Sequence, residues 1–431
     1  MCGYTITKSL IPNIIKHRGT ESYDYKQGHW FINFNSLPLS SNKTGIHQPL
    51  QYQTCCLVFN GEIFNYKELN IKSKSDLHYL SDLFIKLKHN IIKLYEESKK
   101  WEGFWAISVI TNSLIYSFTD PVGKKQLYSS PNGISSEIKP LLIDNNYEYF
   151  HYNEFTFGTH STNFSTVKRL IPGYLYCYDF NYTIPNRIKN QEYFKDNITM
   201  HLYEAIDKSV KERLENKMDG VSLLLSGGLD SNIILHHTLK YTKDIDIVSF
   251  ESNESPLVKD ICDAYGLEVK FIKPDETKYE EALTSFEYSL DYGSLLPNYL
   301  LFGQCKNHIV LTGDGADELF SGYSRALVDD TWTYDVFMEL PYYHNIRLDR
   351  TSMIHTKENR CPLMSYRLIN LSKQIPYKKR RNKLCLRELY KDKLPLSVIN
   401  GIKQPLRHLN NKVYNISLAQ KTHEKIWLKT R

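Results

Sequence analysis

Residues 226–231, with the sequence Ser-Gly-Gly-Leu-Asp-Ser, have the residue types and spacing of a phosphate-binding loop. They follow the apolar run Val221–Leu225 and precede a segment with helical character. Paired glycines allow a tight turn whose N–H groups face an anion, and a helix N-terminus adds partial positive charge. No lysine follows as in the Walker pattern, so γ-phosphoryl transfer is not the implied chemistry. The simpler alternative is a capped turn between a strand and a helix.

A second candidate loop, residues 312–323, carries three acidic residues at Asp314, Asp317 and Glu318. It follows an apolar run that ends at Leu311, and loops after parallel strands are where α/β sheets bind their ligands. Carboxylates this close repel one another and usually need a cation. We therefore expect magnesium, bound with the pyrophosphate of a nucleotide and with Asp230 as a further ligand. The alternative is an acidic loop that caps the next helix.

The start of the chain carries a candidate nucleophile. Removal of Met1 would expose Cys2 with a free α-amine beside its thiol, and that amine can act as the base. Asn60 and Gly61 end an apolar run, and an Asn side chain with a Gly N–H can form an oxyanion hole. Asp76 offers a carboxylate for a substrate ammonium group. Taken singly, these features have plainer explanations, an ordinary chain start and a helix N-cap.

Two kinds of sequence pattern position these residues. Residues 1–190 contain short β-type runs separated by Asn, Gly, Pro and Asp turns, which predicts a domain dominated by antiparallel sheet. From residue 198 to residue 431, helix and strand patterns alternate, which predicts an α/β domain with a parallel sheet. The polar stretch 186–197 marks the boundary between the two.

Composition limits the classes of protein to consider. The 431 residues are 41% hydrophobic and 24% charged, which suits two or three ordinary globular domains. No apolar run approaches the length of a membrane span and the N-terminus lacks a secretory signal pattern, so we expect a cytoplasmic protein. The eight cysteines form no CxxC pair, which disfavours structural zinc and disulfides. A net charge of only +6 gives no reason to expect nucleic-acid binding.

Taken together, the motifs resemble the glutamine-hydrolysing asparagine synthetase family over nearly the whole chain. The matching pieces stand in the family's order: MCG, HRGTES, HQPL, NGEIFNYKEL, DPVGKKQLYSS, SSEIKPLL, RLIPGYLY, SGGLDS, LTGDGADELFSGY, DRTSMIHTKENRCPL and NKLCLRELYKDKLP. The resemblance implies an N-terminal class II glutaminase of the N-terminal nucleophile type, an α/β/β/α sandwich. It also implies a C-terminal parallel-sheet PP-loop synthetase domain that uses ATP and Mg²⁺.

The resemblance assigns a role to each matching residue. Cys2 would attack the amide of glutamine, Asn60 and Gly61 would stabilise the oxyanion, and Glu62 and Asp76 would hold the glutamine. The released ammonia would pass through an internal tunnel. The residues that would bind ATP are Leu224, Ser226, Gly227, Gly228, Leu229, Asp230, Ser231, Thr312 and Gly313. Asp230 and Asp317 would bind Mg²⁺, Asp314 would act as general base, and Lys383 would stabilise charge on the phosphates.

Three departures from the family pattern bear on function. Ser36 stands where the family has an arginine that pairs with the α-carboxylate of glutamine, so Arg18 or another cation would have to replace that contact. Thr119 and Ser365 also replace charged residues of the family. In addition, the chain is short after Tyr323, in the region that shapes the acceptor pocket.

These observations support three hypotheses of different kinds. The leading hypothesis is the conversion of aspartate to asparagine through an acyl-adenylate, with AMP and pyrophosphate released. The first alternative is a related amide-forming or lactam-forming enzyme that adenylates another carboxylate, with ammonia as the donor. The second is a non-catalytic protein that binds a nucleotide or amino acid. We expect small-molecule substrates, a homodimer, and neither nucleic-acid nor membrane partners.

Overall fold

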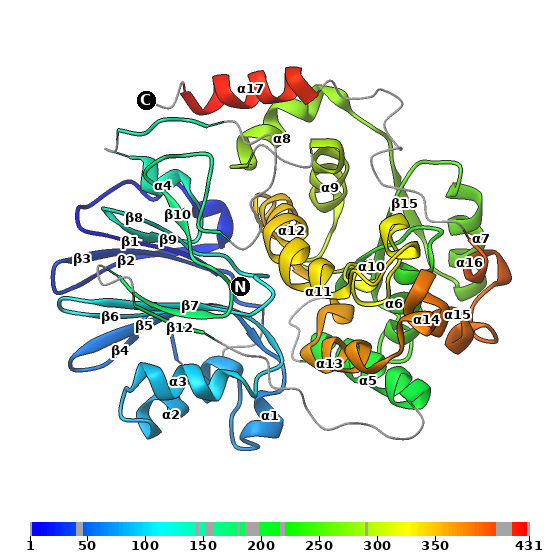
Figure 1. Ribbon diagram of the computed structural model, residues 1–431, viewed down its shortest axis with the longest axis horizontal. Coiled ribbons are helices and arrows are strands. Elements are labelled where there is room, and N and C mark those ends of the chain that lie inside the picture. Colours follow the sequence, from blue (N-terminus) through cyan, green and yellow to red (C-terminus); the bar gives the residue numbers. More distant parts are fainter. Residues whose placement is uncertain are drawn as a thin grey trace.

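The computed structural model describes residues 2–39, 46–143, 146–150, 159–178, 182–185, 198–215, 220–288, 292–401 and 416–428. Two stacked sheets lie on one side of the molecule and a helix-rich unit lies on the other (Figure 1). The boundary predicted at 186–197 falls outside the described residues.

The first half consists of two six-stranded antiparallel sheets. One has the strand order β10-β8-β9-β1-β3-β2 and the other β12-β11-β7-β6-β5-β4. The strands of the first sheet are β1 (Cys2–Thr7), β2 (Glu21–Gln27), β3 (Trp30–Ser36), β8 (Tyr128–Ser130), β9 (Gly133–Ser135) and β10 (Lys168–Arg169). Those of the second are β4 (Leu50–Gln51), β5 (Cys55–Ile63), β6 (Gly103–Thr111), β7 (Ile115–Thr119), β11 (Tyr174–Cys177) and β12 (Tyr182–Pro185).

The two sheets pack through alternating apolar side chains. Tyr4 and Phe34 of the first sheet share a buried cluster with Val58 and Ala106 of the second. Helices α1 (Tyr66–Leu69), α2 (Asp76–Lys86) and α3 (Ile91–Ser98) lie beside the second sheet, and α4 (Lys139–Leu142) lies beside the first (Figure 1). The expected α/β/β/α sandwich is confirmed, with the described helix on the first sheet only one turn long.

The second half is built on a five-stranded parallel sheet with the order β15-β14-β13-β16-β17. Its strands are β13 (Val221–Leu224), β14 (Ile245–Phe250), β15 (Val269–Ile272), β16 (Ile309–Leu311) and β17 (Glu358–Arg360). The chain leaves β13 in one direction to form β14 and β15, and later returns on the other side of β13 to form β16 and β17. The loops after β13 and β16 therefore meet at a point where the strand order reverses, the usual ligand-binding position of such sheets.

Helices surround this sheet and extend to the first half. They are α5 (Ile198–Leu214), α6 (Leu229–Thr238), α7 (Ser255–Tyr265), α8 (Tyr279–Ser285), α9 (Tyr292–Gln304), α10 (Ala316–Leu319), α11 (Trp332–Tyr334), the π-helix Asp335–His344, α12 (Asn345–Met353), α13 (Tyr366–Gln374), α14 (Tyr377–Arg380), α15 (Leu384–Tyr390), α16 (Leu396–Ile399) and α17 (Ile416–Leu428). Helix α17 contributes Trp427 to a buried cluster that joins Leu141 of the first half to Leu283 of the second. The two halves thus share part of their hydrophobic core.

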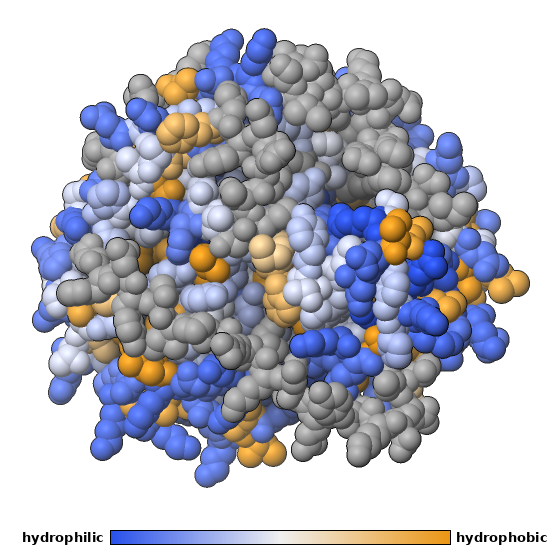
Figure 2. Space-filling view, viewed as in Figure 1, coloured by the Kyte–Doolittle hydropathy of each residue, from blue (hydrophilic) through white to orange (hydrophobic). Residues whose placement is uncertain are grey.

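The surface is mixed in polarity and the cysteines are buried. On the face shown in Figure 2, hydrophobic residues are scattered among hydrophilic ones. Among the described residues, no helix combines the length and apolarity needed to span a membrane. All eight cysteines are buried, and none of them forms a disulfide.

Candidate active sites

The first candidate site surrounds Cys2 at the start of β1, between the two sheets. The backbone N–H of Cys2 donates to Oδ1 of Asn60 over 3.2 Å. Asn60 is fully buried, and its Nδ2 has no hydrogen-bond partner among the described residues. An unpaired buried amide donor costs free energy unless something binds it. The arrangement therefore suits an oxyanion that forms beside the Cys2 thiol.

Two further residues fix this geometry. A Cβ at Gly61 would lie 2.1 Å from the carbonyl oxygen of Phe104, so only glycine fits this position in the strand pair. Gln48 donates from Nε2 to Sγ of Cys2 over 3.8 Å, and its Oε1 accepts from the N–H of Phe59 over 2.7 Å. The sequence assigned no role to Gln48, although it lies in the HQPL segment that carried part of the resemblance.

Burial raises the pKa of the Cys2 thiol, although hydrogen bonds from Leu37 and Ser36 act in the opposite direction. Ser36 is the residue paired with Cys2 in the β1–β3 register, so it lies beside the nucleophile. The missing family arginine would therefore have projected from a position next to Cys2. Residue 36 is a serine in this chain, so the cation for the α-carboxylate of glutamine must come from another position.

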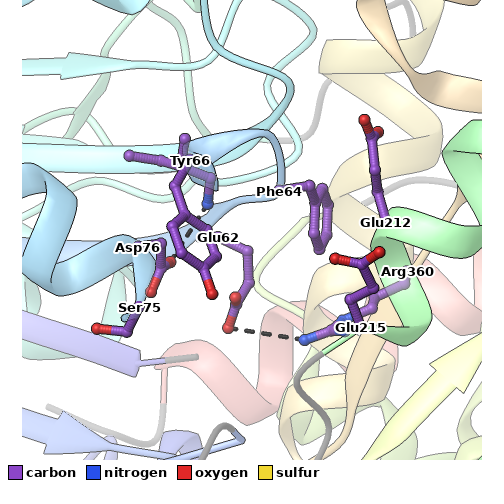
Figure 3. A pocket seen from close by; sticks show the side chains of 9 residues that line it. Glu62, Phe64, Tyr66, Ser75, Asp76, Glu212, Glu215 and Arg360 are labelled. Carbon is purple, nitrogen blue, oxygen red and sulfur yellow. Dashed lines mark hydrogen bonds and ion pairs between the residues drawn. The ribbon is translucent and has the colours of Figure 1, made fainter. Parts of the chain in front are cut away.

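Glu62 and Asp76 line a pocket at the junction of the two halves (Figure 3). Asp76 begins α2 and accepts hydrogen bonds from the N–H groups of Ile63 and Leu77, over 3.3 and 2.7 Å. The N-cap of α2 is Ser75, whose side chain accepts from the N–H of His78. Asp76 is therefore not the N-cap that the plainer interpretation proposed. Burial, reinforced by Asp76, raises the pKa of Glu62 to about 8.

Arg18, the candidate replacement for the missing arginine, binds two buried carboxylates and is not directed at glutamine. Its guanidinium makes a two-pronged contact with Asp349 of α12, over 2.9 and 3.1 Å, and also donates to Glu137 over 2.9 Å. Lys125 donates to the same Asp349 over 2.6 Å. These side chains are about 1% exposed, so they form a buried ionic network between the two halves. Removal of one member of such a network is costly because the remaining partner becomes an unpaired buried charge.

The second candidate site begins with the turn between β13 and α6. The side-chain oxygen of Ser231 accepts from the N–H of Ser226 over 3.1 Å, and Asn232 donates to the carbonyl oxygens of Ser226 and Gly228. The N-cap of α6 is Gly228, which makes no side-chain capping bond. The loop is thus held by contacts within itself and is not a conventionally capped turn. The N–H of Gly227 donates to the Glu254 carboxylate over 3.0 Å, so this donor binds an oxygen anion.

The loop after β16 packs directly against this turn. A Cβ at Gly313 would lie 2.8 Å from the carbonyl carbon of Asp230 and from the nitrogen of Ser231. Thr312 accepts at Oγ1 from the side chain of Asn359 over 3.0 Å. Asp314 lies in the following turn, and the N-cap of α10 is Gly315, with no side-chain cap. The acidic loop is therefore not explained as a helix cap. Leu224, the last residue of β13, is partly exposed at the same sheet edge.

Lys383 connects the two loops. Its Nζ lies 2.5 Å from Oδ2 of Asp230 and 2.6 Å from Oδ1 of Asp317. Burial alone would lower the pKa of Lys383, but Asp230 and Asp317 outweigh it and raise the pKa. The structure brings together Lys383 and two carboxylates that are far apart in the sequence.

The two carboxylates suit a magnesium ion bound with a nucleotide. Mg²⁺ usually takes one or two protein carboxylates and completes its shell with phosphate oxygens and water. Asp230 and Asp317 converge on one ammonium group, which shows that their oxygens reach a common point. Among the residues that the structure describes, no group of three His, Cys, Asp or Glu side chains has the arrangement of a metal site.

Comparison with known proteins agrees with this two-site organisation. Residues 201–341 and 331–426 match the family model described as asparagine synthase. Residues 36–143 match the model described as a glutamine amidotransferase domain.

Three curated relatives are similar along much of the chain. The glutamine-hydrolyzing asparagine synthetase 1 of Bacillus subtilis (strain 168) is 29% identical over 72% of this chain, and the match spans only 55% of that protein. The putative glutamine-hydrolyzing asparagine synthetase 1 of Methanocaldococcus jannaschii is 24% identical over 96% of this chain and 84% of its own length. The human glutamine-hydrolyzing asparagine synthetase is 22% identical over 88% of this chain and 77% of its own length. Since the asparagine synthase model matches more than half of the residues, the chain belongs to the asparagine synthase family.

Proposed function

We propose that this protein is an ATP-dependent amide ligase that takes ammonia from glutamine and releases AMP and pyrophosphate. The observation that carries the proposal is the presence, in one chain, of a buried Cys2–Asn60 centre and a Ser226–Ser231 loop bridged to Asp317 by Lys383. The printed names of the relatives, glutamine-hydrolyzing asparagine synthetases, support the same reaction.

In the first site, the Cys2 thiolate attacks the amide carbon of glutamine. The unpaired Nδ2 of Asn60, with the N–H of Gly61, stabilises the oxyanion. The α-amine of Cys2, which took the thiol proton, returns it to the leaving nitrogen, so that collapse of the intermediate releases ammonia and leaves a thioester on Cys2. Water then hydrolyses the thioester to glutamate. Glu62 and Asp76 hold the glutamine at the end that carries its α-carbon.

In the second site, the acceptor carboxylate attacks the α-phosphorus of ATP, which gives an acyl-adenylate and pyrophosphate. Residues 226–231 and Lys383 hold the pyrophosphate, and Leu224, Thr312 and Gly313 contact the AMP part. Mg²⁺, when bound by Asp230 and Asp317, supplies charge neutralisation for the phosphates. Ammonia attacks the acyl carbon and displaces AMP, and Asp314 takes a proton from the attacking amine.

We propose aspartate as the acceptor, so that the product is asparagine, and a cytoplasmic homodimer as the working form. A different acceptor carboxylate is the second candidate. It is favoured by the acidic residues around His344. Glu318 and Glu339 lie 3.3 and 2.9 Å from this histidine, and both raise its pKa, as Asp314 does. Acidic surroundings disfavour an acceptor with two carboxylates and favour one with a cationic group.

Product analysis separates these candidates. Purified protein is incubated with ATP, Mg²⁺, glutamine and either aspartate or a panel of other amino acids, and AMP, pyrophosphate and amide products are quantified. Equimolar AMP and asparagine support the aspartate assignment. AMP formation with another acid alone identifies that acid as the acceptor, and absence of AMP with every acid contradicts the proposed ligase.

A further inference from the structure

The pocket beside Glu62 is built by both halves of the chain (Figure 3). The first half contributes Glu62, Phe64 and Asp76, among others, and the second contributes Glu212 and Glu215 of the α5 region and Arg360 of β17. Arg360 is the one basic residue among these lining residues.

The guanidinium of Arg360 is held in a fixed orientation. Nε donates to Glu358 and Nη1 donates to the carbonyl oxygen of Arg213, both over 2.5 Å. Nη2 lies 3.7 Å from Oε1 of Glu62, which is longer than a hydrogen bond. The side chain of Arg360 is only 3% exposed. Two nitrogens therefore anchor the group, while the third faces Glu62 across the domain junction.

The acidic residues on the α5 side face cations of their own. Glu212 accepts from Arg367 over 3.4 Å, and Glu215 lies 3.3 Å from the amine of Lys67. On the other side, the raised pKa of Glu62 leaves this carboxyl largely protonated at neutral pH. A second anion near Nη2 of Arg360 would therefore not meet a full negative charge on Glu62.

Strand geometry places Arg360 near the end of the glutaminase site where the α-carbon of glutamine would lie. Asn60 and Glu62 are two residues apart on β5, so their side chains lie on the same face of the sheet, about 7 Å apart along the strand. In glutamine, two methylene groups separate the amide carbon from the α-carbon. An amide bound at Asn60 thus puts the α-carbon beside Glu62, between Asp76 and Arg360.

We propose that Arg360 binds the α-carboxylate of glutamine across the domain junction, with Asp76 binding the α-ammonium group. Arg360 would thus supply from the second half the cation that Ser36 does not supply from the first. This inference rests on the proposed glutaminase function. With Arg360 in this role, the glutamine site is complete only when the two halves are docked.

Truncated substrates test this assignment. 4-Aminobutanamide is glutamine without its α-carboxylate, and glutaramate is glutamine without its α-amino group. Initial rates of hydrolysis of all three are measured for the full-length wild type and for Arg360→Gln, with amidation from ammonium measured as well. Arg213→Gln is the matched control, because Arg213 is also buried and packs on the same Phe64 ring, yet does not line the pocket.

We expect Arg360→Gln to lower kcat/KM for glutamine and for glutaramate by about 10- to 100-fold, mainly through KM, as loss of a charged hydrogen bond predicts. The rate with 4-aminobutanamide should change by less than about 2-fold, because that substrate never contacts Arg360. Arg213→Gln should leave the preference for glutamine over 4-aminobutanamide unchanged. Ser36→Arg, added to Arg360→Gln, should restore part of the lost preference.

An equal fall for glutamine and 4-aminobutanamide, or no fall for either, overturns the role of Arg360 while the glutaminase function stands. A wild type that hydrolyses no glutamine overturns the proposed function itself. If Arg360→Gln does not fold, Arg360→Lys carries the test. It keeps the charge but loses the fixed planar group, so a selective rise in KM for glutamine is still expected.

Discussion

The amine of Lys383 lies 2.5 Å from the carboxylate of Asp230, although 153 residues separate them in the chain. The same amine reaches Asp317 over 2.6 Å. One buried cation therefore ties the loop after β13 to the loop after β16 at the point where nucleotide phosphates would lie.

Lys383→Ala should reduce ATP-dependent AMP formation by about 100-fold or more. The substitution removes the charge that neutralises phosphate oxygens and leaves Asp230 and Asp317 facing each other. Glutamine hydrolysis without ATP should be unchanged, and Lys379→Ala, which removes an exposed lysine paired with Glu388, should affect neither activity. Equal loss of both activities in Lys383→Ala would show that the residue supports the fold and not the phosphates.

Gly313→Ala should raise the KM for ATP by about tenfold or more. The added Cβ would lie 2.8 Å from the backbone of Asp230 and Ser231, so the phosphate-binding loop must move. Gly266→Ala is the control, because its Cβ meets no atom within 4 Å but its φ of 66° is unfavourable for alanine. It should cost about 1 kcal/mol of stability without changing the KM for ATP. Similar ATP kinetics for the two variants would contradict the packing argument.

Asn60→Ala should lower kcat for glutamine hydrolysis by about 10²- to 10³-fold, because an oxyanion donor is lost. Amidation from ammonium should continue at the wild-type rate, since the second site is not altered. Asn33→Ala provides a control, as Asn33 is also a buried asparagine of the sandwich but hydrogen-bonds to Asp24. A kcat for glutamine hydrolysis in Asn60→Ala equal to that of the wild type would contradict the role of Asn60 as an oxyanion donor.

Asp349→Asn should uncouple the two sites. The substitution weakens the buried contacts to Arg18 and Lys125 between the halves, at a cost of about 3–5 kcal/mol for a broken buried pair. More glutamate should then form per amide product, because ammonia escapes. Lys67→Ala breaks an exposed contact to Glu215 between the same halves and should leave the glutamate-to-amide ratio unchanged. A ratio of one in both variants would exclude this role for Asp349.

The contribution of Glu62 to the free energy of unfolding should fall as the pH rises from about 4.5 to 8. Burial and the neighbouring Asp76 raise the pKa of this carboxyl from 4.5 to about 8, so the folded protein keeps a proton that the unfolded chain loses. The contribution is full below pH 4.5 and declines by at most about 1.4 kcal/mol per pH unit as the pH rises. Denaturation of wild type and Glu62→Gln across this range should show a shallower decline in the variant. Identical slopes would contradict the raised pKa.

The sequence was sufficient to predict the two sheet types, and it selected residues that the structure places close together, such as Cys2 with Asn60 and Asp230 with Asp317. The turn 226–231 and the loop 312–323 could be predicted because strand, glycine and acidic residues stand together in each segment. Their contact through Gly313 follows from the parallel order of β13 and β16, which a sequence pattern does not determine.

The contributions that cross the domain junction could not be predicted. Arg360 lies in a short strand about 300 residues from Glu62, and only the docking of the halves brings them together. Gln48 acts through a side-chain contact that leaves no periodic signal. Arg18 likewise stands in a family motif, yet its role as a partner of Asp349 depends on the position of α12.

Transfer of isotope from glutamine to the product tests whether the Cys2 site supplies the nitrogen that the second site uses. Glutamine labelled with ¹⁵N in its amide is supplied with ATP, Mg²⁺ and the acceptor acid, and product nitrogen is followed together with AMP. We expect ¹⁵N in the product amide with one AMP for each amide formed, and loss of that transfer in Cys2→Ala with amidation from ammonium retained. Product amide without ¹⁵N, or labelled amide formed with ADP in place of AMP, would contradict this expectation.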